Sequence, residues 1–361
     1  MNDLARISRR NAAVLATAAL AGLTLAGPRP AGAQSAQDFY KGKNLTMIIV
    51  SGAGGGYDTY SRFLSRHIGR HIPGQPRLVN QNMPGASGIR GTNYLYNVAP
   101  RDGSVMGMTY NTNLTEPLLG NVKAKFDPTQ FEWIGSITTQ YNTCMVWHTS
   151  PVKTIEDAMK GTVRVSTTGL SGNSAKMPKM LNTLLGTKFQ VIHGYTTMGM
   201  RLAVERGEVE GICGFSYDTY AAANPDWLKN KKIRFLIQDA PKRIKELPDV
   251  PLVLSFVKDP KEKEALEVLA VRNAVGRPYL FPPKVPKQFV TALRTAFDET
   301  MKDPKFLAEA DRMHITPDAM TGAQVEAAIK KAYGAAKDVV AVAAKLWPPA
   351  VSKDKKKQKK K

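Results

Sequence analysis

The feature of this chain that most constrains its fold is an alternation of short apolar runs with segments of helical periodicity. An apolar run at residues 45–50 is followed by a glycine-rich turn at residues 52–56. Apolar and aromatic side chains then recur with the spacing of one helix face, from Tyr60 to Ile68. Because this order returns three more times along the chain, we expect an α/β protein with a largely parallel sheet.

Small or hydroxylated residues fill the turn at each of the four strand-to-helix junctions. The turns span residues 52–56, 81–88, 166–174 and 193–197. The first turn of a helix has unpaired N–H groups and partial positive charge, so it can hold an anion without a charged side chain. An ordinary turn with a helix cap explains any single junction equally well. Four junctions, two before residue 90 and two after residue 165, favour a shared anion site beyond the carboxyl ends of the strands.

Several better-known glycine and histidine motifs are absent from the sequence. No Lys-Ser or Lys-Thr pair follows the first glycines, and Tyr57 stands where a dinucleotide fingerprint requires glycine. The segment around Ser171 nearly matches a hydrolase elbow, but Asn173 replaces its last glycine. His67 and His71 lack the glutamate of a zinc-protease helix, so we expect packing and surface roles for them. We therefore predict no nucleotide, metal or other cofactor.

The N-terminal residues have the composition of an export signal. Arg9 and Arg10 precede an apolar stretch at residues 12–26, and a small-x-small cleavage site ends at Ala33. We expect residues 1–33 to be removed near Ala33, by either the general or the twin-arginine route. No later stretch reaches eighteen consecutive apolar residues, so no transmembrane helix is expected.

The formal net charge of +21 comes partly from the two ends of the chain. Residues 1–33 contribute +3 and residues 353–361 contribute +6, which leaves +12 on the middle of the chain. The lysine-rich tail at residues 351–361 has no interleaved aromatic side chains, so we expect a disordered end and no nucleic-acid partner. The remaining excess suits the attraction of small anions. Cys144 and Cys213 are the two cysteines; they either form a disulfide or stay as buried thiols.

Several longer motifs resemble those of one family, the tripartite tricarboxylate transporter solute receptors, also called the Bug family of periplasmic binding proteins. The resemblance covers nearly all of residues 38–335. Its motifs are the glycine loop at residues 52–58, "NQNMPGASG", "NVAPRDGSVMGM", "STTGLSGNS", "GYTTM", "RGEVEG" and "KRIKELPDVPLV". Many members carry a cleft-facing Asp after the "GEVEG" strand, where this chain has residues 213–216 (Cys-Gly-Phe-Ser), a difference that disfavours a ligand with an amino group.

The resemblance implies a two-lobed fold of the Venus-flytrap kind (type II-like), with mainly parallel sheets and a hinge cleft. We expect residues 34–143 and 265–350 to form the first lobe and residues 144–264 the second. The implied ligand is a small organic carboxylate held by main-chain donors from both lobes. The implied contacts in the first lobe are Ala53, Gly54, Gly55, Gly56, Tyr57, Asp58, Pro84, Gly85, Ala86 and Ser87. Those in the second lobe are Thr167, Thr168, Ser174 and Tyr195.

The resemblance also implies a function without catalysis. The chain would be a monomeric periplasmic receptor that delivers its ligand to one large and one small integral-membrane subunit of a transporter. Two alternatives stay open. One is a secreted α/β hydrolase that uses Ser171 or Ser174 with His193 as its base, and the other is a sensory receptor of the same fold. Arg90 and Arg201 are each either a clamp for a distal carboxylate or a solvated helix residue.

Overall fold

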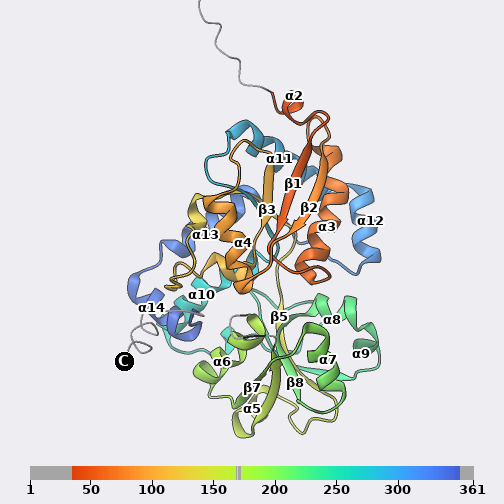
Figure 1. Ribbon diagram of the computed structural model, residues 1–361. Helices are drawn as coiled ribbons and strands as arrows, with labels where there is room; N and C mark the ends of the chain where they lie inside the picture. The colour runs from red at the N-terminus through yellow and green to blue at the C-terminus, as the bar shows by residue number, and fades with distance from the viewer. Residues whose placement is uncertain (1–34, 168, 170–171, 350–361) are drawn as a thin grey trace, which may run out of the picture.

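The fold consists of two lobes, each built on one β-sheet and covered by helices (Figure 1). The computed structural model describes residues 35–349 except residues 168, 170 and 171. The expected export signal, the lysine-rich tail, Thr168 and Ser171 therefore lie outside the described residues. Within the described part, no helix is both long enough and apolar enough to span a membrane.

The first lobe holds a six-stranded sheet in the order β11-β4-β10-β3-β1-β2. Its strands are β1 (Asn44–Ile49), β2 (Arg77–Asn82), β3 (Val105–Met108), β4 (Glu132–Ser136), β10 (Pro278–Phe281) and β11 (Met320–Thr321). Its helices are α2 (Ala36–Tyr40), α3 (Gly56–Ile68), α4 (Ile89–Asn97), α11 (Lys287–Thr300), α12 (Pro304–Arg312) and α13 (Gly322–Tyr333). Strand β1 pairs in parallel with β2 and β3, whereas β10 runs antiparallel between β3 and β4.

The second lobe holds a five-stranded sheet in the order β7-β6-β8-β5-β9. Its strands are β5 (Asn142–Trp147), β6 (Val163–Thr167), β7 (Phe189–His193), β8 (Gly211–Ser216) and β9 (Ile233–Asp239). Its helices are α5 (Ile155–Lys160), α6 (Asn173–Leu185), α7 (Thr197–Glu205), α8 (Tyr217–Ala223) and α9 (Pro225–Lys229). Strand β6 is parallel to β7 and β8, and β5 is antiparallel to β8 and β9.

The structure confirms the two-lobed α/β fold, but its sheets are mixed. All four predicted strand-to-helix junctions are present, as β1–α3, β2–α4, β6–α6 and β7–α7. Besides the two-residue edge strand β11, which pairs antiparallel with β4, the antiparallel strands are β5 and β10, and each enters its sheet after the chain has crossed from the other lobe. A strand that arrives from the opposite lobe does not follow a right-handed crossover of its own sheet, so it is free to pair antiparallel.

Two crossing segments lie against each other between the lobes. Residues 137–141 lead from β4 to β5, and residues 275–277 lead from α10 (Pro260–Ala274) to β10. The backbone N–H of Gln140 donates to the carbonyl of Asn273 at 2.7 Å, and that of Gly276 donates to Thr138 at 3.0 Å. A Cβ at Gly276 would come within 2.6 Å of the Thr138 carbonyl oxygen, so the close approach requires glycine.

Helix α14 (Lys337–Leu346) and the adjacent Trp347 close one side of the junction between the lobes. Helix α14 packs on α10 and also on α6 of the second lobe. The fully buried Trp347 ring lies 3.5 Å below the guanidinium of Arg272, which pairs with Asp239 at 3.0 Å. A second buried ion pair joins Glu116 to Lys176 of α6. These cations lie in a low-dielectric region, and each has a carboxylate partner there.

Five short 3-10 turns complete the described chain. They are η1 (Gly69–His71), η2 (Ala86–Gly88), η3 (Asn111–Leu114), η4 (Pro128–Gln130) and η5 (Val253–Ser255).

Cys144 and Cys213 form a disulfide within the second sheet. They are direct partners on the antiparallel strands β5 and β8, with Cα atoms 3.9 Å apart. Both are fully buried. The bond closes a loop with a sequence separation of 69 residues, so it restricts the unfolded chain substantially.

Removing the disulfide should destabilise the protein. We expect Cys144→Ala combined with Cys213→Ala to lower the free energy of unfolding by about 4 kcal/mol, the value that loop closure predicts for a loop of this length. Urea titrations of the oxidised wild type and the double variant measure the difference. Equal stabilities would contradict a bond that constrains the unfolded state.

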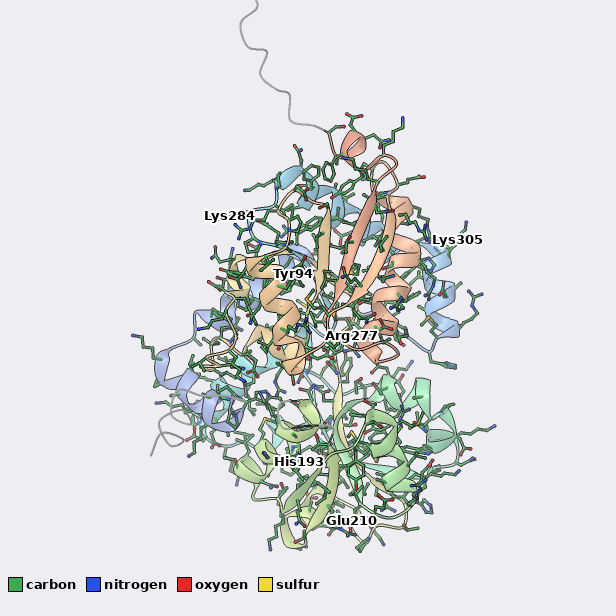
Figure 2. All side chains as sticks on the ribbon, viewed as in Figure 1. Tyr94, His193, Glu210, Arg277, Lys284 and Lys305 are labelled. Atoms are coloured by element: carbon green, nitrogen blue, oxygen red, sulfur yellow. A yellow bond between two sulfur atoms is a disulfide. The ribbon has the colours of Figure 1, made fainter. Side chains whose placement is uncertain are left out.

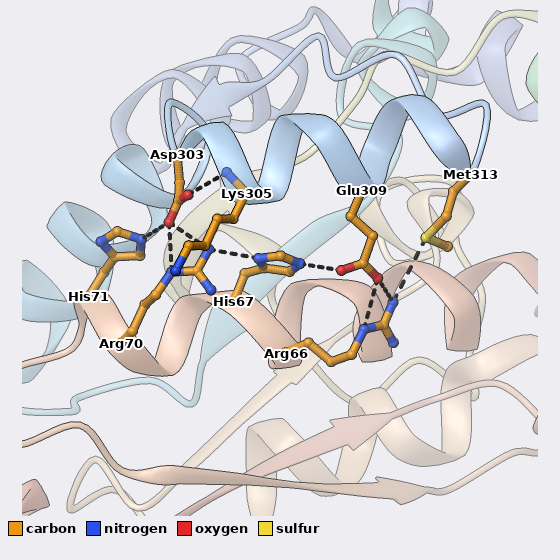
Figure 3. A network of polar contacts seen from close by, with 8 residues as sticks. All are labelled: Arg66, His67, Arg70, His71, Asp303, Lys305, Glu309 and Met313. Carbon is orange, nitrogen blue, oxygen red and sulfur yellow. Dashed lines mark hydrogen bonds and ion pairs between the residues drawn. The ribbon is translucent and has the colours of Figure 1, made fainter.

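A polar network joins α3 to α12 on the outer side of the first lobe (Figure 3). His67 Nε2 lies 2.7 Å from Glu309 Oε2, and the Arg70 Nη2–H donates to His67 Nδ1 at 2.7 Å. The His67 ring is therefore fixed between Arg70 of η1 and Glu309 of α12. Asp303 binds Arg70 and also His71 Nε2, the latter at 2.8 Å. The two histidines therefore have structural roles, as the sequence predicted.

This network should make stability depend on acid pH. Burial acts to raise the pKa of Asp303, but hydrogen bonds from His71 and Arg70 outweigh it and hold that pKa below its ordinary value. Its stabilisation is therefore complete above about pH 4, the ordinary pKa of the unfolded group, and is lost as the pH falls below that value. We expect Asp303→Asn to lose less stability than the wild type between pH 5 and pH 2.5 in urea titrations.

The matched control is Asp311→Asn. Asp311 is exposed on the same helix and forms no ion pair with any described residue. This variant should keep the acid dependence of the wild type. If Asp303→Asn also kept the acid dependence of the wild type, the ion pair of Asp303 would not be the cause of that dependence.

Candidate functional site

A cleft opens between the two lobes at the ends of the strands. It consists of two adjoining cavities of about 610 Å³ and 420 Å³. The residues that line both cavities are Ser51, Gly55, Gly56, Tyr110, Thr197, Thr219 and Arg277. Each of the four strand-to-helix junctions contributes lining residues: 51–57 from the first, Ser87 from the second, 172–174 from the third and 196–198 from the fourth.

The first loop presents its backbone to the cleft. The predicted contacts Ala53 and Gly54 line the larger cavity, Tyr57 lines the smaller one, and Gly55 and Gly56 line both. Gly54 has a φ of 77°, a conformation that glycine adopts without strain. Gly55 is the N-cap of α3 and offers no side chain to the free N–H groups of the helix. Those donors and the helix dipole are therefore available to an anionic ligand.

Asp58 supports this loop from behind and does not line either cavity. Its carboxylate accepts hydrogen bonds from the Gly54 N–H at 2.9 Å, from Asn82 at 2.8 Å and from Arg62 at 3.0 Å. Burial acts to raise the pKa of Asp58, but these hydrogen bonds lower it below its ordinary value. Asp58 is ionised at neutral pH and fixes the loop, so the structure places it as a positioning residue.

The second loop has a strained backbone. The φ angles of Gly85, Ala86, Ser87 and Gly88 are 137°, 48°, 54° and 80°. A Cβ on Gly88 would lie 2.9 Å from Val50 and 3.0 Å from Tyr110, so the turn is packed tightly against β1 and the cleft wall. Of the predicted contacts in this loop, Ser87 lines the smaller cavity, whereas Pro84, Gly85 and Ala86 line neither. Strain of this kind persists where the surroundings hold the backbone in place.

The predicted contacts of the second lobe are divided in the same way. Ser174 lines the smaller cavity, and its hydroxyl lies 2.7 Å from that of Thr167. Thr167 is fully buried behind it. Tyr195 lines neither cavity, and its hydroxyl lies 3.5 Å from Glu208. Thr168 is outside the described residues.

Arg277 is the main cleft residue that the sequence analysis missed. Only 3% of its surface is exposed, and Figure 2 places it between the two lobes. Its guanidinium lies 4.3 Å from the Tyr57 ring centroid and 4.8 Å from that of Tyr60. Its Nη1 donates to the Gly276 carbonyl at 3.1 Å, and its Nε is buried without a hydrogen-bond partner. Among the described residues, it forms no ion pair.

The charge of Arg277 is retained in spite of its burial. Burial acts to lower its pKa, but the neighbouring Tyr57, Tyr60 and Asp218 raise it above its ordinary value. The stacked tyrosine faces add cation–π stabilisation, a favourable term for a desolvated guanidinium. Burial in turn raises the pKa of Tyr110, which packs on Tyr57, to about 12. The tyrosines therefore stay neutral beside a permanent cation.

Asp218 is a second cleft residue that the sequence analysis missed. It lines the larger cavity from the start of α8, and its carboxylate accepts a hydrogen bond from the Tyr60 hydroxyl of α3 at 2.7 Å. This bond connects the two lobes across the cleft. Asp218 lies two residues after residues 213–216, the segment that the sequence analysis noted for its lack of an Asp, so the cleft does contain a carboxylate near β8.

The arrangement suits binding of an anion more than covalent chemistry. The described chain contains no cluster of three His, Cys, Asp or Glu side chains that could hold a metal. Ser174 bonds to Thr167, and His193, at the end of β7, lines neither cavity. The cleft instead combines helix-start N–H groups, a buried guanidinium and aromatic walls. These groups together can bind and desolvate a small carboxylate.

Comparisons with known proteins agree with this geometry. No model of a known family matches the chain. The chain is 25% identical over 303 residues to the UPF0065 protein in the TAR-I ttuE-ttuC' intergenic region of Agrobacterium vitis. The match covers 82% of this chain and 83% of that protein.

Solved structures of solute-binding proteins have the same fold. A TctC solute binding protein from Polaromonas has a TM-score of 0.62 at 20% identity, covering 85% of this chain and 99% of its own. The periplasmic binding protein BugD has a TM-score of 0.63 at 20% identity, covering 85% and 98%. MatC from Rhodopseudomonas palustris, with bound malate, has a TM-score of 0.62 at 17% identity, covering 82% and 99%. The two-lobed fold expected from the sequence is thereby confirmed.

Replacing Asp58 should loosen the first loop. In Asp58→Asn, the new amide group can face only some of the three donors that the carboxylate now accepts, so a buried donor loses its partner. We expect the free energy of unfolding at pH 7 to fall by about 2 kcal/mol, measured by urea titration.

The control for this prediction is Glu156→Gln, which changes an exposed carboxylate in the first turn of α5 and should leave stability within about 0.5 kcal/mol. The difference between wild type and Asp58→Asn should narrow below about pH 4, because the pKa of Asp58 is depressed in the folded state and its contribution is lost as the pH falls. A pH-independent difference would contradict a role for the charge.

Proposed function

We propose that this chain, which has the fold of the TctC and Bug solute-binding proteins, is an extracytoplasmic receptor for a small organic carboxylate. It delivers the acid to one large and one small integral-membrane subunit of a tripartite tricarboxylate-type transporter. The observation that carries the proposal is the position of Arg277, a buried cation without an ion-pair partner in the described chain, beside the N-terminus of α3. A Cβ on Gly56 would lie 3.5 Å from Arg277 Nη2, so this cation and the helix-start donors border the same space.

In the proposed mode of binding, the first carboxylate enters between the glycine loop and Arg277. Backbone N–H groups at the start of α3 supply fixed dipoles, and the guanidinium supplies a full charge. Because both are already oriented in the protein, little reorganisation opposes binding. The second lobe contributes hydroxyl groups from Ser174 and Thr197, which can adjust to the ligand.

The solved structures support an organic acid as the ligand class. MatC was determined with bound malate, and another Rhodopseudomonas palustris protein of similar fold, with a TM-score of 0.63, was determined with adipate. Both are carboxylates at neutral pH. The proposal extends this ligand class to the present chain through its own donors and its own arginine.

The location and the extent of the lobes are part of the proposal. We place the receptor in the periplasm, as a monomer, after export and cleavage near Ala33. The division into residues 34–143 with 265–350 and residues 144–264 is supported by the sheets, since β1–β4, β10 and β11 form one and β5–β9 form the other.

A ligand panel tests the proposed function. We expect one or more mono-, di- or tricarboxylates at about 100 times their Kd to stabilise the mature protein by about 2.7 kcal/mol. For a protein of this size, that is about 5 °C in Tm by thermal shift. The corresponding amides should produce no shift. No new product should appear when the bound acid is analysed by mass spectrometry after incubation.

The variant Arg277→Gln should weaken binding of every acid in the panel at least about tenfold, because it removes a charge-assisted hydrogen bond. Arg294→Gln removes the same charge from α11, away from the cleft, and should bind as the wild type does. Chemical turnover of an acid, or the absence of any acid-induced shift, would contradict the receptor function. Uptake of the bound acid in cells that lack the protein distinguishes transport from sensing.

A further inference from the structure

The larger cavity contains a second arginine, on the lobe opposite Arg277. Arg201 lies on α7 of the second lobe and lines the 610 Å³ cavity together with the glycine loop and Arg277. The sequence left its role open between a carboxylate clamp and a solvated residue. Arg90, the other candidate, is exposed and lines neither cavity.

Arg201 is held in place but is not neutralised. Its Nη1 donates to Asn224 Oδ1 at 3.0 Å, and its Nε is buried without a hydrogen-bond partner. Within the described chain, it forms no ion pair. Other charged groups at the junction differ in this respect, because Arg272 and Lys176 each contact a carboxylate.

Among the described residues that line this cavity, Asp218 is the only one with a carboxylate side chain. It accepts a hydrogen bond from Tyr60 and is not within ion-pair distance of either arginine. Asp218 therefore lowers the net positive charge of the cavity but does not form an ion pair with either guanidinium group. Two guanidinium groups, one from each lobe, remain available to a ligand that enters between them.

We propose that Arg201 binds a second carboxylate of the ligand and makes the receptor selective for dicarboxylates over monocarboxylates of the same chain length. The inference rests on the proposed function, in which Arg277 and the start of α3 hold the first carboxylate. A diacid then reaches from the first lobe to the second and pairs both guanidinium groups. A monoacid leaves Arg201 facing an alkyl end, so the desolvation of that cation is not compensated.

Calorimetric titration of matched acids tests the inference. Succinate is compared with butyrate, and adipate with hexanoate, at constant ionic strength and pH 7. For the pair that fits the cleft, the wild type should bind the diacid about 10- to 100-fold more tightly than the monoacid. In Arg201→Gln, the preference should be lost: the diacid affinity should fall at least about tenfold, while the monoacid affinity should stay the same or rise, because no uncompensated cation remains.

Two further variants control the test. Arg206→Gln removes an exposed arginine just after the same helix, outside both cavities, and should keep the preference of the wild type. Arg201→Lys keeps the charge but loses the two-point geometry of guanidinium, so the preference should fall about three- to tenfold. If Arg201→Gln does not fold, Arg201→Lys decides the question, because an unchanged preference in that variant would overturn the proposal.

The outcomes separate this inference from the proposed function. Acid binding without any diacid preference would overturn the role of Arg201 and leave the receptor function intact. Equal losses for both acids in Arg201→Gln would also overturn it, because they indicate general support of the cleft. If no acid binds the wild type, the proposed function itself fails.

Discussion

A charged side chain loses several kcal/mol of hydration when it is buried, unless another group compensates its charge. The junction between the two lobes of this protein is built around that constraint. Arg272 and Lys176 are buried there, each has a carboxylate partner, and both lie close to the Trp347 ring. Arg277 is equally buried, but among the described residues it forms no ion pair and contacts tyrosine faces and a carbonyl oxygen. The difference distinguishes the cations that pair with carboxylates at the junction from Arg277, which lines the cleft without an ion pair in the described chain.

The crossing segments explain why that cation lies where it does. Arg277 immediately precedes β10, the strand that returns from the second lobe and inserts between β3 and β4. Its backbone N–H donates to Ser136 Oγ at 3.0 Å, which fixes the chain at the edge of the cleft. The guanidinium therefore points from the hinge towards the start of α3. Arg277 is linked to both lobes, because it stacks on Tyr60 of the first lobe and the Tyr60 hydroxyl donates to Asp218 of the second lobe.

Local sequence patterns were sufficient to predict the four junctions, the glycine loop at the cleft and the structural roles of His67 and His71. Such features depend on side-chain spacing along one helix or on the backbone of one turn. Arg277 has no such pattern, because a single arginine before a proline reaches the cleft only through the pairing of β10. The same holds for Asp218, and for Thr167, which lies beneath Ser174 instead of beside the ligand space. These positions depend on contacts between segments far apart in the sequence.

The strands of the first sheet come from two separate stretches of the chain, and this affects how the protein folds during synthesis. All strands of the second sheet lie between Asn142 and Asp239, so that lobe is complete as soon as one continuous stretch has left the ribosome. The first sheet lacks β10 and β11 until Thr321 has been made, and the cover over Arg272 and Lys176 awaits Trp347. Because chains emerge N-terminus first, the early strands β1–β4 must wait for their late partners. Nascent chains of this protein therefore carry an unfinished first lobe for most of their translation.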